Sequence, residues 1–124
     1  MTKPARLLVL TIVATFLALR MSLVISPDSD FNVAGYNVHH LFTGVLVMFA
    51  GGAALALGAR GRIALVTFGI GAGLTLDEVV YLIATDGTNA SYLNRVSWIG
   101  GIVTVALALL YIIILDRHIG GKRE

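Results

Sequence analysis

The sequence has no cysteine, only two prolines and few charged residues. The absence of cysteine excludes disulfides, thiolate metal sites, iron–sulfur clusters and cysteine nucleophiles. Charged residues make up 13% of the 124 residues, whereas ordinary soluble domains carry roughly 25%. Hydrophobic residues reach 57% and the mean hydropathy is +0.89. This composition is typical of an integral membrane protein and excludes an ordinary soluble domain.

The net charge of +2 does not indicate a nucleic-acid partner. The basic residues lie at the ends of apolar segments, where membrane orientation explains them better than a phosphate-binding face does. No stretch outside the apolar segments is long enough to form a soluble core. We therefore expect the lipid bilayer as the environment of this chain, and one transmembrane domain over residues 1–124.

Four apolar segments follow one another along the chain, each near the ~20 residues that cross a hydrocarbon core. Backbone polar groups in lipid must be hydrogen-bonded within their segment, and four long segments are too few for a barrel. The predicted fold class is all-α, a polytopic four-transmembrane-helix bundle. The predicted helices cover residues 7–25, 38–59, 63–84 and 96–115. The first segment could instead be a signal peptide, but no small-x-small cleavage site precedes Ser26.

Lysine and arginine are distributed unequally between the connections. They lie before the first segment, between the second and third, and after the fourth, at Lys3, Arg6, Arg60, Arg62, Arg117, Lys122 and Arg123. The two other connections, 26–37 and 85–94, contain Asp28, Asp30 and Asp86 but no lysine or arginine. The positive-inside rule therefore predicts a multi-pass protein of the cell membrane with both its N and C termini in the cytoplasm.

Fourteen glycines in a helical protein require an explanation, because glycine weakens helices in water. In membranes, small residues let helix backbones approach closely. The second segment carries a row of small residues on one face that begins at His40 and Gly44, and the third carries Gly69-x-x-x-Gly73 on a face that continues to Asp77. We expect these glycine seams to pack helices together within the chain, in a homo-oligomer or against a membrane-protein partner.

Several polar residues fall together in the outer half of the predicted bundle. At ~1.5 Å of rise per residue, they lie about 5 to 14 Å above the bilayer midplane. These residues are Arg20, Asp77, Glu78, Tyr81, His39 and His40. A charged group near a helix centre is costly and normally pairs inside the bundle. We expect a buried ion pair between Arg20 and Asp77 or Glu78, with Asp77 preferred. Glu78 would then bind a proton, a metal or a histidine.

Histidine and carboxylate ligands suit zinc or non-haem iron. The candidate ligands of a divalent metal are His39, His40, Glu78 and Asp77, with Tyr81 and Gly44 as supporting residues. Adjacent helical residues point about 100° apart, so His39 and His40 cannot both aim at one ion, and His40 lies on the glycine seam. The Glu-x-x-His repeats of di-iron bundles, the His-Glu-x-x-His zinc helix and a bis-histidine haem arrangement are absent from the sequence.

Two strings carry most of these residues. They are HHLFTG, from His39 to Gly44, and GIGAGLTLDE, from Gly69 to Glu78. Together they resemble a group of small, uncharacterised, four-helix integral membrane proteins of bacteria and archaea, in which a His-His-x-x-x-Gly helix start precedes a Gly-rich helix ending in Leu-Asp-Glu. Phe42 meets only part of that group's pattern after the histidine pair. The resemblance implies that both strings form one unit, and it brings no established activity.

Three functions remain open at this point, and the sequence leaves undecided whether the protein is an enzyme. The first is a membrane-embedded metal site that activates water or a substrate. The second is proton-linked transport or sensing, in which Glu78 exchanges a proton with the outside through His40 and Tyr81. The third is a structural or assembly subunit of a membrane complex, whose polar cluster locks the helices. A Ser-His-Asp hydrolase is disfavoured, because no convincing nucleophile lies at the right depth.

Overall fold

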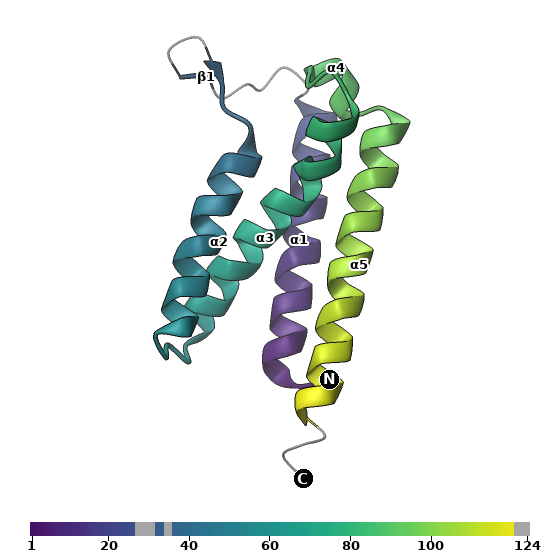
Figure 1. Ribbon diagram of the computed structural model, residues 1–124. Helices are drawn as coiled ribbons and strands as arrows, with labels where there is room; N and C mark the ends of the chain where they lie inside the picture. Colours follow the sequence, from purple (N-terminus) through teal and green to yellow (C-terminus); the bar gives the residue numbers. More distant parts are fainter. Residues whose placement is uncertain (27–31, 34–35, 121–124) are drawn as a thin grey trace.

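The computed structural model describes residues 1–26, 32–33 and 36–120, and the described residues are predominantly helical (Figure 1). Their elements are α1 Lys3–Ile25, β1 Asn32–Val33, β2 Tyr36–Asn37, α2 His40–Ala56, α3 Arg62–Ala84, α4 Asn89–Tyr92 and α5 Arg95–Gly120. The two short strands pair antiparallel, with Asn32 opposite Asn37 and Val33 opposite Tyr36. Asp28 and Asp30 of the predicted outer connection lie outside the described residues.

Three of these helices, α1, α3 and α5, are long and apolar enough to cross a membrane. Helix α2 is apolar but shorter, with 17 residues, at the lower end of the lengths that cross a bilayer. Large apolar side chains cover the outside of the helices, including Leu46 at 70%, Phe49 at 74% and Ile99 at 62% exposure. In water such a surface would aggregate. These helices confirm the prediction of a helical membrane protein.

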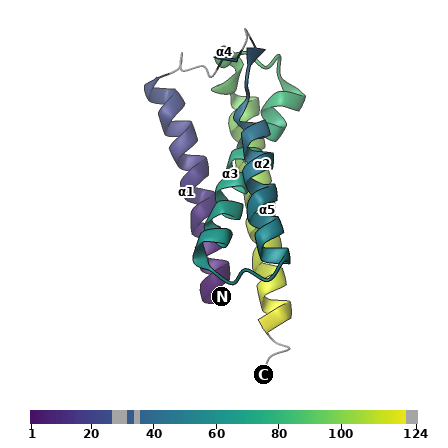
Figure 2. The same cartoon turned by 90° about the vertical axis from the view of Figure 1, so that its left-hand side faces the viewer.

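Helix α3 occupies the centre of the arrangement, because α1, α2 and α5 all pack against it. Helix α3 runs obliquely between α2 and the α1–α5 pair (Figure 1), and the view in Figure 2 shows α1 and α2 on different sides of it. The buried apolar core lies where α1, α3 and α5 meet, at Ile12, Phe16, Ala72 and Val105. The described N-terminal and C-terminal ends lie at the same end of the molecule as the α2–α3 connection (Figures 1 and 2).

The glycine seams are used inside the chain. A Cβ atom added at Gly71 would lie 2.1 Å from the backbone nitrogen of Met48, and one added at Gly51 would lie 2.4 Å from that of Phe68. Such contacts show that α2 and α3 touch through their backbones, which only glycine permits. At Gly69 and Gly73, α3 instead makes room for the side chains of Thr11 and Thr15 on α1.

The helix ends differ from the predicted ones for local reasons. Helix α1 starts four residues before the predicted segment, because the side chain of Thr2 accepts the backbone N–H of Ala5 and Pro4 is favourable in a first turn. Helix α2 stops at Ala56, since Gly58 adopts a φ of +94° that ends the helix. The amide of Ala59 then donates to an α2 carbonyl and closes the turn.

Candidate functional site

The side chain of Arg20 on α1 lies at the centre of a buried polar cluster and is 1% exposed. Its Nε donates to Asp77 Oδ1 at 2.6 Å, and its Nη2 donates to the backbone carbonyls of Asp77 and Ser97 at 3.1 and 3.3 Å. Its Nη1 donates to the carbonyl of Tyr92 and to Ser97 Oγ, both at 3.0 Å. A guanidinium has five N–H donors, so every donor of Arg20 has an acceptor.

Aromatic rings surround the same guanidinium. The Cζ atom of Arg20 lies 4.3 Å from the ring centre of Tyr92, 5.0 Å from that of Trp98 and 5.5 Å from that of Phe16. Ring faces attract cations within about 6 Å, and the attraction is strongest where water is absent. The cluster therefore joins α1, α3, α4 and α5 around one charge.

Asp77 on α3 is fully buried and accepts hydrogen bonds on both carboxylate oxygens. Its Oδ1 receives Arg20, whereas its Oδ2 receives the hydroxyl of Tyr92 and lies 3.0 Å from His40 Nε2. The structure thus brings Arg20 and Asp77 together, and it adds Tyr92, which sequence reasoning missed. No sequence signal singles out Tyr92, because its position depends on how the connection after α3 folds back over the bundle.

Glu78 plays a different part, at the start of α2. Its Oε2 accepts the backbone N–H of Leu41 at 2.6 Å, and its Oε1 lies 3.2 Å from Nδ1 of His39. The first four N–H groups of a helix have no partner within it, and the helix dipole favours a negative charge there. His39, at the N-cap position of α2, makes no capping bond with its own side chain. The carboxylate of Glu78 therefore caps α2 from a neighbouring helix.

His40 connects the two carboxylates. Its Nε2 lies 3.0 Å from Asp77 Oδ2 and its Nδ1 lies 3.4 Å from Glu78 Oε1. The side chains of His39 and His40 are 17% and 23% exposed, so this edge of the cluster reaches the surface. Asp77 and Glu78 carry two negative charges when ionised, and Arg20 balances only one of them.

The remaining predicted residues surround this cluster. Tyr81 is 1% exposed, its hydroxyl donates to the carbonyl of Thr88 at 3.1 Å, and its ring packs against those of His39 and Tyr92. Gly44 lets α2 approach α3, because an added Cβ would lie 2.7 Å from Leu74 Cβ. Tyr81 and Gly44 therefore support the positions of the charged groups.

The connection between α3 and α5 contains a short helix and a helix cap that were not predicted from the sequence. Helix α4 covers Asn89–Tyr92, and the side chain of Asn94 accepts the backbone N–H of Ser97 at 2.8 Å. Asparagine directly before a helix is a recognised N-cap signal, so this cap was detectable in the sequence. The cap holds Ser97 in the first turn of α5, where the Oγ of Ser97 reaches Arg20.

The metal prediction at His39, His40, Glu78 and Asp77 is not supported. Among the residues that the structure describes, no group of three or more histidine, aspartate or glutamate side chains is placed to hold a metal ion. The physical reason is that the guanidinium of Arg20, the hydroxyl of Tyr92 and the amide of Leu41 already donate to the carboxylate oxygens. A zinc or iron ion would have to displace these donors, and no other group would satisfy them.

No protein family, curated protein or solved structure matches this chain. Its function is therefore inferred from the contacts of the polar cluster and from the surfaces around it.

A carboxylate outside the membrane-spanning helices, Asp86, stabilises the connection between α3 and α4. The hydroxyl of Ser91, followed by the backbone and side chain of Thr88, lowers the pKa of Asp86 below its usual value. The distances from Asp86 Oδ1 to the nitrogen and hydroxyl of Thr88 are 3.2 and 2.9 Å. Asp86 thus holds the short turn that carries Tyr92 over the cluster.

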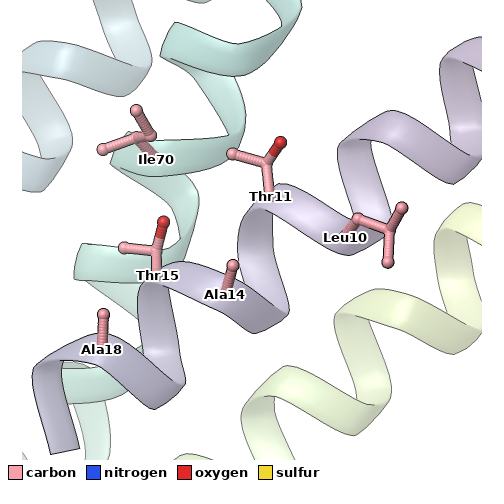
Figure 3. Close-up of a pocket in the computed structure, with 6 residues that line it drawn as sticks. All are labelled: Leu10, Thr11, Ala14, Thr15, Ala18 and Ile70. Carbon is pink, nitrogen blue, oxygen red and sulfur yellow. The ribbon is translucent and has the colours of Figure 1, made fainter. Parts of the chain in front are cut away.

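An open apolar groove of about 460 Å³ lies along α1, away from the cluster (Figure 3). It is lined by Leu10, Thr11, Ala14, Thr15, Ala18 and Ile70. Ala14 and Ala18 are exposed, and they interrupt a surface otherwise covered by large apolar side chains. The small side chains of α1 thus allow a neighbouring molecule to approach the helix backbone here.

Proposed function

We propose that this chain is a four-span protein of the cell membrane with both termini in the cytoplasm. Helix α2 supports the fourth span, because it packs along α3 from the outer cluster at Glu78 to Ala64 near the opposite end. At ~1.5 Å per residue its 17 residues cover about 25 Å, and the turn that follows extends this length. A bilayer core of ~30 Å can thin slightly around such a helix.

Two single-cysteine variants test this topology in a chain without native cysteine. Gly61→Cys lies in the α2–α3 connection, where an added Cβ meets nothing within 4 Å, and Ala90→Cys is exposed on α4. A membrane-impermeant maleimide added to intact cells should label Ala90→Cys and spare Gly61→Cys. Labelling of both positions, or of Gly61→Cys alone, would contradict the orientation.

We propose that the protein is a structural or assembly subunit of the membrane, and that the polar cluster locks its helices in one arrangement. The observation that carries this proposal is the complete use of the guanidinium of Arg20, whose five donors reach α3, α4 and α5. A catalytic group must keep an atom available for substrate. The cluster instead directs its donors and acceptors at each other, and Glu78 is committed to α2.

The groove on α1 supports an assembly role, with a second copy of the chain as the proposed neighbour. Exposed Ala14 and Ala18 are spaced four residues apart, the small-xxx-small pattern through which membrane helices associate. Ala14→Cys should form a cross-linked dimer in native membranes with a short bifunctional maleimide. Leu107→Cys, on an exposed part of α5, is the matched control and should stay monomeric. Equal cross-linking at the two positions would contradict a specific contact.

A second candidate function, sensing of external pH, is favoured by the position of His40 between two buried carboxylates. Exchange of a proton with the outside at this position would change the contacts of Asp77 and Glu78 with α2, and with them the position of the outer end of α2. The titratable and charged groups that meet there are Arg20 from α1, His39 and His40 from α2, Asp77, Glu78 and Tyr81 from α3, and Tyr92 from α4.

A spin-label distance between α1 and the start of α2 separates the two functions. The sensor predicts a distance that changes reversibly with external pH in the native sequence and does not respond in His40→Gln. A purely structural cluster predicts a constant distance in both proteins. His118→Gln is the control, because His118 lies exposed near the far end of α5.

A further inference from the structure

Basic side chains from three separate parts of the chain form one layer at the end of the bundle opposite the polar cluster. Helices α1 and α3 run in the same direction, and one residue offset relates them where they touch, because Gly69 faces Thr11 and Gly73 faces Thr15. The same offset places Arg62, the first residue of α3, level with the first turn of α1. Arg60 lies beyond it in the short α2–α3 connection.

The end of α5 joins this layer through a direct contact with the start of α1. The amide and the hydroxyl of Thr2 donate to the carboxylate of Asp116 at 2.9 and 2.5 Å. Arg117 therefore lies at the depth of the first turn of α1. The basic layer consists of Lys3, Arg6, Arg60, Arg62 and Arg117, all exposed.

The basic layer has no counter-ion among the described residues. The ion pairs among the described residues all involve Arg20, His39 or His40 of the polar cluster, and none involves a residue of the basic layer. Asp116 is the acidic side chain that the structure describes at this end, and its two oxygens accept from Thr2. The positive charge of the basic layer thus faces outward.

Apolar side chains place this layer at the depth of lipid headgroups. Leu57 and Ile63 flank the Arg60–Arg62 turn and are 89% and 83% exposed, and Ile119 follows Arg117 at 45% exposure. The helices to which these side chains belong are apolar enough to lie in a membrane, and there the side chains would lie beside hydrocarbon. The arginines are only a few residues from these apolar side chains. They therefore lie at the edge of the hydrocarbon, at the depth of the lipid phosphate groups. A soluble polyanion would not cover the apolar side chains.

We propose that the basic layer binds the headgroups of anionic phospholipids. Juxtamembrane lysines and arginines attract anionic lipids, and the attraction decays within a Debye length. Three separate segments contribute, so bound lipids would bridge the ends of α1, α3 and α5. This inference concerns a surface distinct from the polar cluster and does not rest on the proposed function.

Fluorescence quenching in vesicles tests the proposal on the full chain. A fluorophore on Gly61→Cys reports contact with brominated lipids in phosphatidylcholine vesicles that contain a minor fraction of brominated phosphatidylglycerol or, separately, of brominated phosphatidylcholine. Brominated phosphatidylglycerol should quench the fluorophore more strongly, and added salt should reduce the difference. Equal quenching by the two lipids would overturn the proposal.

Matched variants assign the preference to the basic layer. Arg60→Gln combined with Arg62→Gln, in the labelled protein, should weaken the association of phosphatidylglycerol about fivefold per charge removed. Both residues are exposed, so the fold should be kept, which circular dichroism can verify. Arg95→Gln, at the opposite end of α5, should leave the preference unchanged. If the stronger quenching by phosphatidylglycerol survives the double substitution, the assignment to the basic layer is wrong. If soluble polyphosphate at equal phosphate concentration abolishes the stronger quenching, the assignment to lipid is wrong.

Discussion

The two sides of the polar cluster differ in how completely they are enclosed. On the Arg20 side, the guanidinium and the carboxylate of Asp77 are 1% and 0% exposed and their closest contact is 2.6 Å. On the histidine side, His39 and His40 are 17% and 23% exposed, and their contacts with Glu78 are 3.2 and 3.4 Å. The same kinds of charge thus form a closed pair on one side and an open edge on the other.

The depths expected from the sequence give a physical reason for this difference. A charge far from water is tolerated only when every donor and acceptor finds a partner, because nothing else can solvate it. Groups near the interface can exchange partners with water, so their contacts need not be complete. The Arg20 side should therefore control stability, and the histidine side should control any response to conditions.

The largest effect is expected from breaking the closed side. Arg20→Ala leaves the carboxylate of Asp77 buried without its cation and should lower the free energy of unfolding by about 3 to 5 kcal/mol. Adding Asp77→Ala should restore part of this loss, since the unpaired charge is then removed. Denaturant unfolding of the three variants in detergent measures the cycle. Additive losses would show that the two side chains are not coupled, and exposed Arg95→Ala serves as the control.

The contact between α2 and α3 can be broken without touching a charge. Gly51→Ala would place a Cβ 2.4 Å from the backbone of Phe68, which cannot move aside, so we expect a loss of about 1 to 3 kcal/mol. Gly52→Ala is the neighbouring control, because its Cβ would meet the ring of Phe68 at 3.5 Å, an ordinary contact. Equal melting temperatures for the two variants would contradict the close packing of α2 on α3.

A smaller effect is expected on the open side. Glu78→Ala removes the cap of α2 and should cost about 1 kcal/mol, whereas Glu78→Gln keeps an oxygen for the amide of Leu41 and should cost less. Thermal unfolding with zinc, with iron and with a chelator should give one melting temperature, since the carboxylates already have donors. A rise in melting temperature on adding metal, absent in Glu78→Ala, would restore the metal hypothesis.

The smallest effect concerns the turn above the cluster. Because the folded-state pKa of Asp86 is lowered, its ionised form stabilises the fold above the ordinary pKa of an aspartate, and this contribution is lost as the pH falls through the lowered value. Ser91→Ala removes the largest cause of the shift and should raise the pKa toward the ordinary value. An NMR titration of the Asp86 carboxyl measures this. An unchanged midpoint in Ser91→Ala would contradict the role of its hydroxyl.

The sequence alone determined that this is a helical membrane protein, because the period and length of its apolar segments and its scarcity of charge depend on no distant contact. It also indicated that Arg20, Asp77 and Glu78 share a depth and that His39 and His40 lie nearer the outer surface, since depth follows from position along a helix. The partners within that layer could not be predicted in the same way. They depend on how the helices rotate and tilt against each other.

Only the tertiary structure decided what each charge does. The close approach of α2 to α3 through Gly51 and Gly71 brings the amide of Leu41 to Glu78, so a carboxylate that seemed free for a metal is a helix cap. The fold of α4 brings Tyr92 to Asp77, although Tyr92 lies in a connection with no apolar pattern. Both outcomes arise because segments far apart in the sequence pack closely against each other. The hydropathy of a single segment carries no information about such packing.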